Sequence, residues 1–218
     1  MVTAIKKQTH VKRRIALAIL AALIVVAAAL LAAKFGDPLR EGWQLYRQSI
    51  PNDEAVFEKA DEVRSMTGYT ALEDISETYL ETLLHEEDRR FYYHRGVDPI
   101  GVARALYVNL KNGKIVQGAS TITMQLSRNL FYSTERTTVR KIAEVFTAFR
   151  IERLLDKDEI LELYCNEAYF GENCYGIRAA AEYYYGVEPS ELDSEQSYAL
   201  VYTLRAPSVY HPEPNIAA

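Results

Sequence analysis

The chain has 218 residues, of which 49% are hydrophobic and 25% are charged, a composition that supports a packed core rather than disorder. Its formal net charge is −5, but the part after Lys34 holds all 30 acidic residues and 19 of the 25 basic ones, giving −11. That charge argues against nucleic acid as a partner, although a local cluster of cations can still bind an anionic substrate.

Residues 15–33 form an uncharged run of apolar side chains without glycine or proline. As a helix this run would span roughly 28 Å, about the thickness of the hydrocarbon core of a bilayer. Five basic residues precede it: Lys6, Lys7, Lys12, Arg13 and Arg14. The positive-inside rule predicts a cytoplasmic tail over 1–14, a single transmembrane signal-anchor over 15–33, and the remainder outside the membrane. A cleaved signal peptide is the alternative, but its apolar region is usually only about 7–15 residues long.

Residues 34–70 are expected to be a polar connector with helical pieces, and residues 71–218 a folded domain. From residue 71 onward the apolar spacing is that of helices, so the expected fold class is all-α, with two lobes. Helices are expected over 78–91, over 99–112 between an Asp98 cap and Gly113, and from Thr138 with one apolar stripe (Val139, Ile142, Phe146, Phe149). Further helices are expected after a capping box of Asp156 and Glu159, over 175–185, and over 194–204.

The two cysteines, Cys165 and Cys174, are nine residues apart, and no zinc-like spacing of Cys and His occurs. We expect Cys165 on a helix, Cys174 in a loop, and no obligatory disulfide between them. The sixteen tyrosines include three in a row, Tyr183 to Tyr185. They suit either a platform that stacks on sugars or core positions in which the ring is buried and the hydroxyl reaches water. The core interpretation is favoured.

The segment EDRRFYYHRGVD, residues 87–98, concentrates charged and aromatic side chains. If it is helical, Glu87, Phe91 and His94 share a face. A carboxylate held against apolar rings is suited to general acid–base chemistry, because desolvation raises the pKa of a Glu. The alternative is an ordinary acid on a helix surface.

The segment from Gln117 to Gln125 offers hydrogen-bonding groups without charge, and Gly118 permits close approach of a ligand to the backbone. Its alternative interpretation is a simple helix N-cap at Ser120 or Thr121. Downstream, RKIAE places Arg140 and Lys141 on the same side of a helix as Glu144. With Arg128 and Arg136 these cations suit a pyrophosphate clamp, and the alternative is a surface ladder of ion pairs.

Taken in order, these segments resemble the five motifs of glycosyltransferase family 51, the peptidoglycan glycosyltransferases of penicillin-binding proteins and their monofunctional relatives. Residues 87–98 fit E-D-x-x-F-x-x-H-x-G-x-D at every fixed position. GASTITMQLSRN fits the second motif except at Met124, where many members have Gln, and RKIAE is the third. KDEILELYCNEAYFG and GIRAAAEYYYG resemble the fourth and fifth, with Cys165 and Tyr185 in place of the common Leu and Phe. The resemblance covers roughly residues 75–212.

The resemblance implies a lysozyme-like two-lobed fold with its smaller lobe near the bilayer of a bacterial cell. It implies that the enzyme polymerises lipid II with inversion, releasing undecaprenyl pyrophosphate, with Glu87 as the base and Glu144 as the second acidic residue. A divalent metal, Mg or Mn, is expected near the pyrophosphate, and no organic cofactor. The implied substrate-binding residues are Asp88, Phe91, His94, Gly118, Ser120, Thr121, Thr123, Gln125, Arg128, Asn129, Arg136, Arg140 and Lys141.

The expected partners are lipid II, the growing lipid-linked glycan strand, the membrane and a separate transpeptidase. The transpeptidase is expected to be separate because no S-x-x-K, S-x-N or K-T-G motif follows residue 186. A monofunctional enzyme is therefore expected, and a truncated bifunctional one is the alternative. Two rival functions are a lysozyme-like hydrolase or lytic transglycosylase that uses Glu87 as an acid, and a non-catalytic scaffold that binds lipid II.

Overall fold

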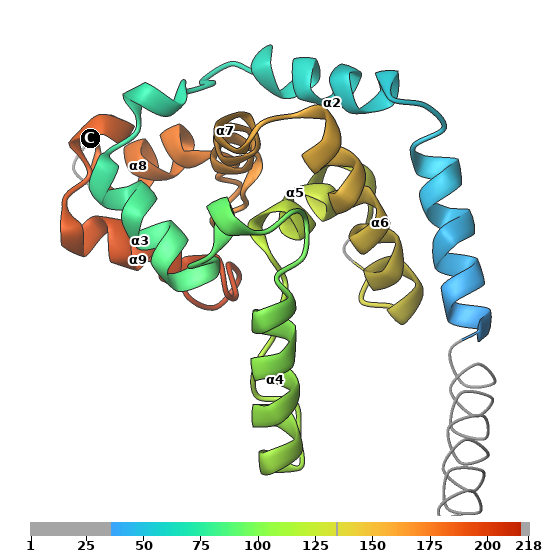
Figure 1. Cartoon of the computed structure of the whole chain (residues 1–218). Coiled ribbons are helices and arrows are strands. Elements are labelled where there is room, and N and C mark those ends of the chain that lie inside the picture. Colours follow the sequence, from blue (N-terminus) through green and yellow to red (C-terminus); the bar gives the residue numbers. More distant parts are fainter. Residues whose placement is uncertain (1–35, 134, 215–218) are drawn as a thin grey trace, which may run out of the picture.

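The computed structural model describes residues 36–133 and 135–214, and this part of the chain is almost wholly helical (Figure 1). Within these ranges the only β-type pairings are two isolated bridges, Arg95 with Val97 and Tyr169 with Tyr175. The all-α prediction is therefore confirmed for the described residues. The predicted anchor over 15–33 lies outside them, and no helix in the described ranges is both long and apolar enough to cross a bilayer.

A helical segment over residues 36–49 comes first. The elements that follow are α2 (Glu54–Arg64), η1 (Leu72–Asp74), α3 (Glu77–Glu87), η2 (Phe91–Tyr93), α4 (Pro99–Asn112), α5 (Ile122–Phe131), α6 (Thr138–Leu154), α7 (Lys157–Glu167), α8 (Ile177–Tyr185), η3 (Pro189–Glu191) and α9 (Ser194–Thr203). Each predicted helix has a counterpart whose ends differ by a few residues, except that the helix expected over 78–91 is interrupted after Glu87.

Helix α7 lies at the centre of the core, with α2, α5, α6 and α8 packed around it. Six of the seven residues between Ile160 and Asn166 are buried. Apolar side chains lie on more than one face of this helix, so it packs against neighbours on several sides. Its first turn is fixed by the predicted capping box of Asp156 and Glu159. As predicted, Cys165 lies on α7 and Cys174 in a loop. Both thiols are buried and free in the structure.

Helix α4 projects away from this core (Figure 1). It begins as predicted, with the Asp98 side chain accepting a hydrogen bond from the backbone N–H of Ile100 and with Pro99 at its first position. It ends at Gly113, whose φ of 63° is left-handed and therefore suits glycine.

The expected connector over 34–70 contributes to the core. Val56, Ala60 and Val63 of α2 are buried within it. The segment 36–49 runs beside α6 (Figure 1), and a Cβ at Gly42 would lie 2.6 Å from the Ile142 side chain. This contact explains the apolar stripe predicted on α6. The stripe meets an amphipathic helix, whereas the deeply buried face of α6 is formed by Ala143, Glu144, Thr147, Ala148 and Ile151.

The prediction that one helix spans residues 78–91 is wrong. Helix α3 ends at Glu87, because Asp88 leaves helical geometry with φ −155° and ψ 72°. The Asp88 carboxylate instead accepts a hydrogen bond from the backbone N–H of Ile122, at the start of α5. Glu87, Phe91 and His94 therefore do not share a helix face, and the face on which Glu87 was expected to be desolvated does not form.

Candidate active site

Glu87 is the last residue of α3, and its carboxylate is held by a chain of two hydrogen bonds. The Gln125 side-chain amide donates to Glu87 Oε2 at 2.8 Å. The amide oxygen of Gln125 in turn accepts from the Tyr164 hydroxyl at 3.1 Å. Burial, and then the charge of Glu87, raises the pKa of Tyr164 well above its ordinary value, so its hydroxyl stays protonated and donates. The chain fixes which end of the Gln125 amide faces the carboxylate.

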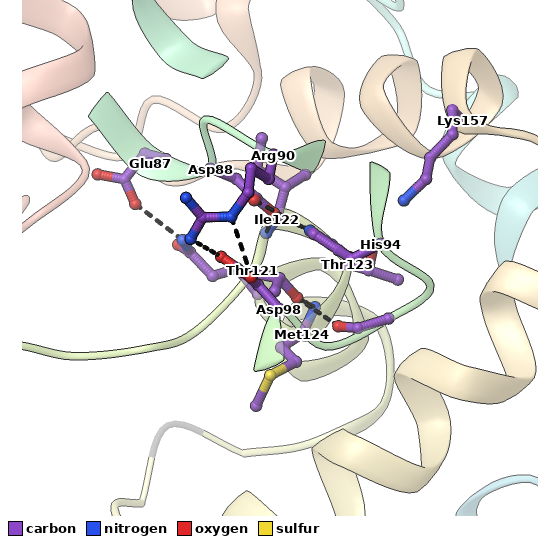
Figure 2. A network of polar contacts seen from close by, with 12 residues as sticks. Glu87, Asp88, Arg90, His94, Asp98, Thr121, Ile122, Thr123, Met124 and Lys157 are labelled. Atoms are coloured by element: carbon purple, nitrogen blue, oxygen red, sulfur yellow. Dashed lines mark hydrogen bonds and ion pairs between the residues drawn. The ribbon is translucent and has the colours of Figure 1, made fainter. Parts of the chain in front are cut away.

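Asp88, the residue after Glu87, is hydrogen-bonded to the start of α5 (Figure 2). Its two oxygens each lie 3.0 Å from His94 Nε2, and one of them also accepts from the backbone N–H of Ile122 at 3.0 Å. Asp88 and His94 are both buried. Because buried polar groups must be paired, this small network sets the position of Glu87 relative to α5, which carries Gln125.

A second network joins the end of α3 to the start of α4. Arg90 forms an ion pair with Asp98, the N-cap of α4 (Figure 2). Gly101 makes room for it, because a Cβ there would lie 2.5 Å from Asp98 Oδ2. The side chain of Asp98 thus stabilises both the helix start and the orientation of Arg90.

Glu144 organises cations on the first turns of α6. It is only 1% exposed, and its two oxygens pair separately with Arg140 and with Lys141, the latter at 2.7 Å. Lys141 also donates to Ser120 Oγ at 2.7 Å, which ties the loop before α5 to α6. A buried carboxylate with each oxygen paired to a cation positions those cations rather than presenting itself to a ligand.

Glu87 lines one cavity, and its hydrogen-bond partner Gln125 lines another. The first has a volume of about 270 Å³ and is lined by the end of α3, the start of α4 and the loop before α5, including Glu87, Asp88, Gly118, Ser120 and Thr121. The second, of about 610 Å³, is lined by Gln125, Asn129, Tyr164, Tyr169 and the tail after α9. In the described part of the chain, its charged lining side chains are all arginines: Arg128, Arg136, Arg140 and Arg205.

Comparison with known proteins identifies the family. The family model described as Transglycosylase matches residues 53–218. The chain belongs to the transglycosylase family. Penicillin-binding protein 1A of Escherichia coli is 49% identical over 141 residues, 65% of this chain and 17% of that protein. Penicillin-binding protein 1A of Aquifex aeolicus is 44% identical over 144 residues, which are 66% of this chain and 20% of that protein. Penicillin-binding protein 1A of Neisseria gonorrhoeae is 37% identical over 193 residues, which are 86% of this chain and 24% of that protein. The chain thus spans about a fifth of the length of these relatives.

The resemblance to peptidoglycan glycosyltransferases, based on the five motifs, is thereby confirmed at the level of the family. The matched residues begin within the expected connector, at residue 53, where α2 starts.

The predicted binding residues of this transglycosylase fall into three groups. Most line a cavity: Asp88, Gly118, Ser120, Thr121, Gln125, Arg128, Asn129, Arg136 and Arg140. Lys141 lines neither of the two but is bonded to Ser120 and Glu144. Phe91, His94 and Thr123 are buried instead, with Thr123 donating to Glu152 and the Phe91 ring lying under the Lys157 ammonium. For Phe91, His94 and Thr123 the structure supports a structural role. Thr121 has two roles, because it lines the cavity and is also the N-cap of α5.

Sequence reasoning missed Arg205, Tyr164 and Tyr169. Arg205 follows α9 in a segment without helical periodicity, and only the fold brings it to the cavity, where it also pairs with Glu86, the neighbour of Glu87. The tail around Arg205 packs closely against Gly171, whose φ is 86°. A Cβ at this position would lie 2.5 Å from the Pro207 carbonyl oxygen, so only glycine permits this approach. Tyr164 lies within the fourth motif, but its spacing alone indicates only a core residue.

Glu144 does not suit a metal in this arrangement, because both of its oxygens are already paired with cations. Within residues 36–133 and 135–214, no cluster of three or more His, Cys, Asp or Glu side chains is arranged as a metal site. We therefore assign no step of the reaction to a metal.

Proposed function

We propose that this transglycosylase polymerises lipid II into glycan strands of peptidoglycan, by β-1,4 glycosyl transfer with inversion and release of undecaprenyl pyrophosphate. One observation carries the proposal: Gln125, which donates a hydrogen bond to the Glu87 carboxylate, also lines a cavity whose charged side chains are four arginines. The guanidinium group of an arginine can donate two parallel hydrogen bonds to two oxygens of one phosphate, so this cavity suits a pyrophosphate. A hydrolase of neutral glycan would have no use for such a cluster.

In the proposed reaction Glu87 takes the proton from the C4 hydroxyl of the acceptor sugar, which lies in the smaller cavity. The oxygen attacks the anomeric carbon of the lipid-linked growing strand, from the face opposite the pyrophosphate. The bond between the anomeric carbon and the pyrophosphate oxygen breaks, and that oxygen keeps the electron pair. The developing negative charge is stabilised by Arg128, Arg136 and Arg140, which are already in place before the bond breaks.

Gln125 and Glu144 act through other groups in this proposal. Gln125 donates a hydrogen bond to the Glu87 carboxylate and thereby fixes its orientation. Glu144 positions Arg140 and Lys141. It is a positioning residue here, because its oxygens are buried and occupied.

The proposed place of action is the outer face of a bacterial cell membrane, where lipid II would be the substrate and a separate transpeptidase a partner. The fold supports this through α4, which projects from the core and exposes apolar side chains, among them Ile100, Leu106, Tyr107 and Leu110. Exposed apolar patches of this kind suit a membrane surface. The predicted single-pass anchor over 15–33, with a cytoplasmic N-terminus, would confine the enzyme to the surface that holds its substrate.

The test is incubation of the purified, detergent-solubilised protein with lipid II, followed by gel analysis of the products. A ladder of lipid-linked strands is the expected result. Shortening of preformed glycan instead would favour the hydrolase, and bound substrate without turnover the scaffold. A requirement for Mg²⁺ or Mn²⁺, retained here only as a prediction from the family resemblance, is tested in the same assay by adding a chelator and then restoring each metal.

A further inference from the structure

A third cavity lies beside the arginine-lined one, at the end of α9. Its volume is about 350 Å³, and Tyr202, Tyr210 and His211 supply its aromatic walls. None of the motifs identified in the sequence includes these three residues. The cavity lining contains no Asp, Glu, Lys or Arg side chain, and His211 is its one ionisable group besides the tyrosines, so the lining suits an uncharged ligand.

The tyrosines around this cavity form an ordered row. The rings of Tyr198 and Tyr202 are stacked, with centroids 6.3 Å apart and planes inclined by 20°, and Tyr210 lies 5.1 Å from Tyr202. Their exposed fractions are 53%, 38% and 45% for Tyr198, Tyr202 and Tyr210. Single exposed tyrosines are ordinary, but here the Tyr202 ring contacts both of the others, so the three form a continuous aromatic surface that begins at the cavity and extends beyond it to Tyr198.

The core holds one wall of the cavity in place. His211 stacks on Tyr184 at 6.1 Å, and the Tyr184 hydroxyl donates to the Phe170 carbonyl oxygen at 2.9 Å. Tyr184 is buried, which confirms the core interpretation for the middle residue of the Tyr183–Tyr185 run. The aromatic surface that the tyrosine content suggested is therefore formed by other tyrosines, on α9 and the tail.

The new cavity adjoins the proposed pyrophosphate site. Val209 lines both cavities. Arg205 lines the arginine cavity, and its guanidinium lies over the Tyr202 ring, 5.2 Å from the centroid. A ligand with its charged end among the arginines can therefore continue past Arg205 and Val209 onto the tyrosine row.

We propose that Tyr198, Tyr202 and Tyr210 bind neutral, β-linked sugar units of the growing glycan strand, beyond the units at the reaction centre. The inference rests on the proposed function, in which the strand is held by the pyrophosphate at one end, so that its older sugars must lead away from the arginines. A pyranose ring has an apolar face and a rim of hydroxyls, and a tyrosine offers a matching apolar face and a polar tip. A lining without Lys or Arg suits such a ligand better than it suits a phosphate.

The direct test uses a soluble probe, the hexamer of β-1,4-linked N-acetylglucosamine, titrated into the 218-residue protein in detergent and followed by calorimetry. Wild type is expected to bind it, and the double variant Tyr202→Ala with Tyr210→Ala to bind about tenfold or more weakly. Tyr202→Phe keeps the ring and is expected to retain binding. Tyr107→Ala, which removes a more exposed tyrosine on α4, outside the row, serves as the control.

A second readout separates this inference from the proposed function. With lipid II as substrate, the double variant is expected to join the first two molecules at the wild-type rate but to yield shorter strands. Failure of wild type to join lipid II would count against the proposed function, and the hexamer titration would still decide the sugar site. Equal affinity of wild type and double variant for the hexamer, or no binding of the hexamer by wild type, would overturn the inference. Binding of an apolar peptide but not of the hexamer by wild type would also overturn it.

Discussion

At the scale of single residues, the site depends on how neighbouring groups hold Glu87. Sequence reasoning identified Glu87, Gln125 and the arginines of the second and third motifs, because their residue types carry the chemistry. It did not identify Tyr164, whose hydroxyl completes the hydrogen-bond chain to Glu87, or Arg205, which arrives from a non-periodic tail. Both belong to the site only through tertiary packing, which local patterns do not encode.

Tyr164→Phe removes one hydroxyl and leaves the buried ring in place. Without that donor the Gln125 amide loses one of its two partners, so the Glu87 carboxylate is less well oriented. We expect kcat for lipid II to fall about tenfold, with KM nearly unchanged. A purely structural role would instead change stability and KM together, which steady-state kinetics alongside thermal unfolding would reveal.

Arg136→Ala removes an exposed arginine from the wall of the larger cavity. Because the Arg136 side chain is exposed and lies outside the packed core, the variant should fold normally but bind the anionic donor more weakly. The expected result is a several-fold increase in KM for lipid II with a small change in the free energy of unfolding. An unchanged KM would contradict the clamp. Arg47→Ala, another exposed arginine outside the cavity, is the control.

At the scale of elements, the helix caps were predictable and the end of α3 was not. Asp98, Pro99 and Gly113 signal the bounds of α4 by local chemistry alone. The break after Glu87 depends on Asp88 pairing with His94 and with the start of α5, 34 residues downstream of Asp88. Helical periodicity therefore extended α3 by four residues too many, up to Phe91.

Asp98→Ala should weaken the start of α4, lowering the free energy of unfolding by about 1–2 kcal/mol. Partial burial disfavours the Asp98 carboxylate, but hydrogen bonds from Arg90, Gly101 and Ile100 outweigh it and hold its pKa below 3.8. The stabilisation is thus fully present above pH 3.8, the ordinary value, and is lost as pH falls through the lowered pKa of the folded state.

Denaturant unfolding of wild type and Asp98→Ala at a series of pH values measures this difference. Asp98→Asn, which keeps an N-cap but loses the charge, isolates the contribution of the ion pair with Arg90. A gap between wild type and Asp98→Ala that stays constant down to the lowest pH would contradict the assignment.

Gly42→Val tests the docking of the segment 36–49 on α6. A side chain at this position meets Ile142 Cγ2 at 2.6 Å and the Val139 carbonyl oxygen at 3.0 Å, so the two helices must separate. Overpacking of this kind typically costs about 1–3 kcal/mol of unfolding free energy. Gly36→Ala, where a Cβ meets nothing within 4 Å, should be neutral. Equal stability of the two variants would show that the contact contributes nothing.

At the scale of the whole molecule, the order of motifs along the chain predicted the fold class and the family, because each motif is local. How the motifs meet was not predictable from their order. Residues from α3, α5, α6, α7 and the tail after α9 converge around two cavities, with one carboxylate at the junction. The start of α4 lines the smaller cavity, whereas the rest of α4 and the segment 36–49 lie outside this centre (Figure 1).

The central claim is that Glu87 is the base of a lipid II polymerase. The most direct measurement compares the initial rate of lipid II polymerisation by wild type, Glu87→Gln and Glu81→Gln, in the same detergent. Glu81 is an exposed glutamate on the same helix, six residues earlier. We expect wild-type rates for Glu81→Gln and at least a hundredfold loss for Glu87→Gln, with equal thermal stability of all three, since losing a positioned base typically costs about 10²–10⁴ in rate. Normal strand growth by Glu87→Gln would contradict the account.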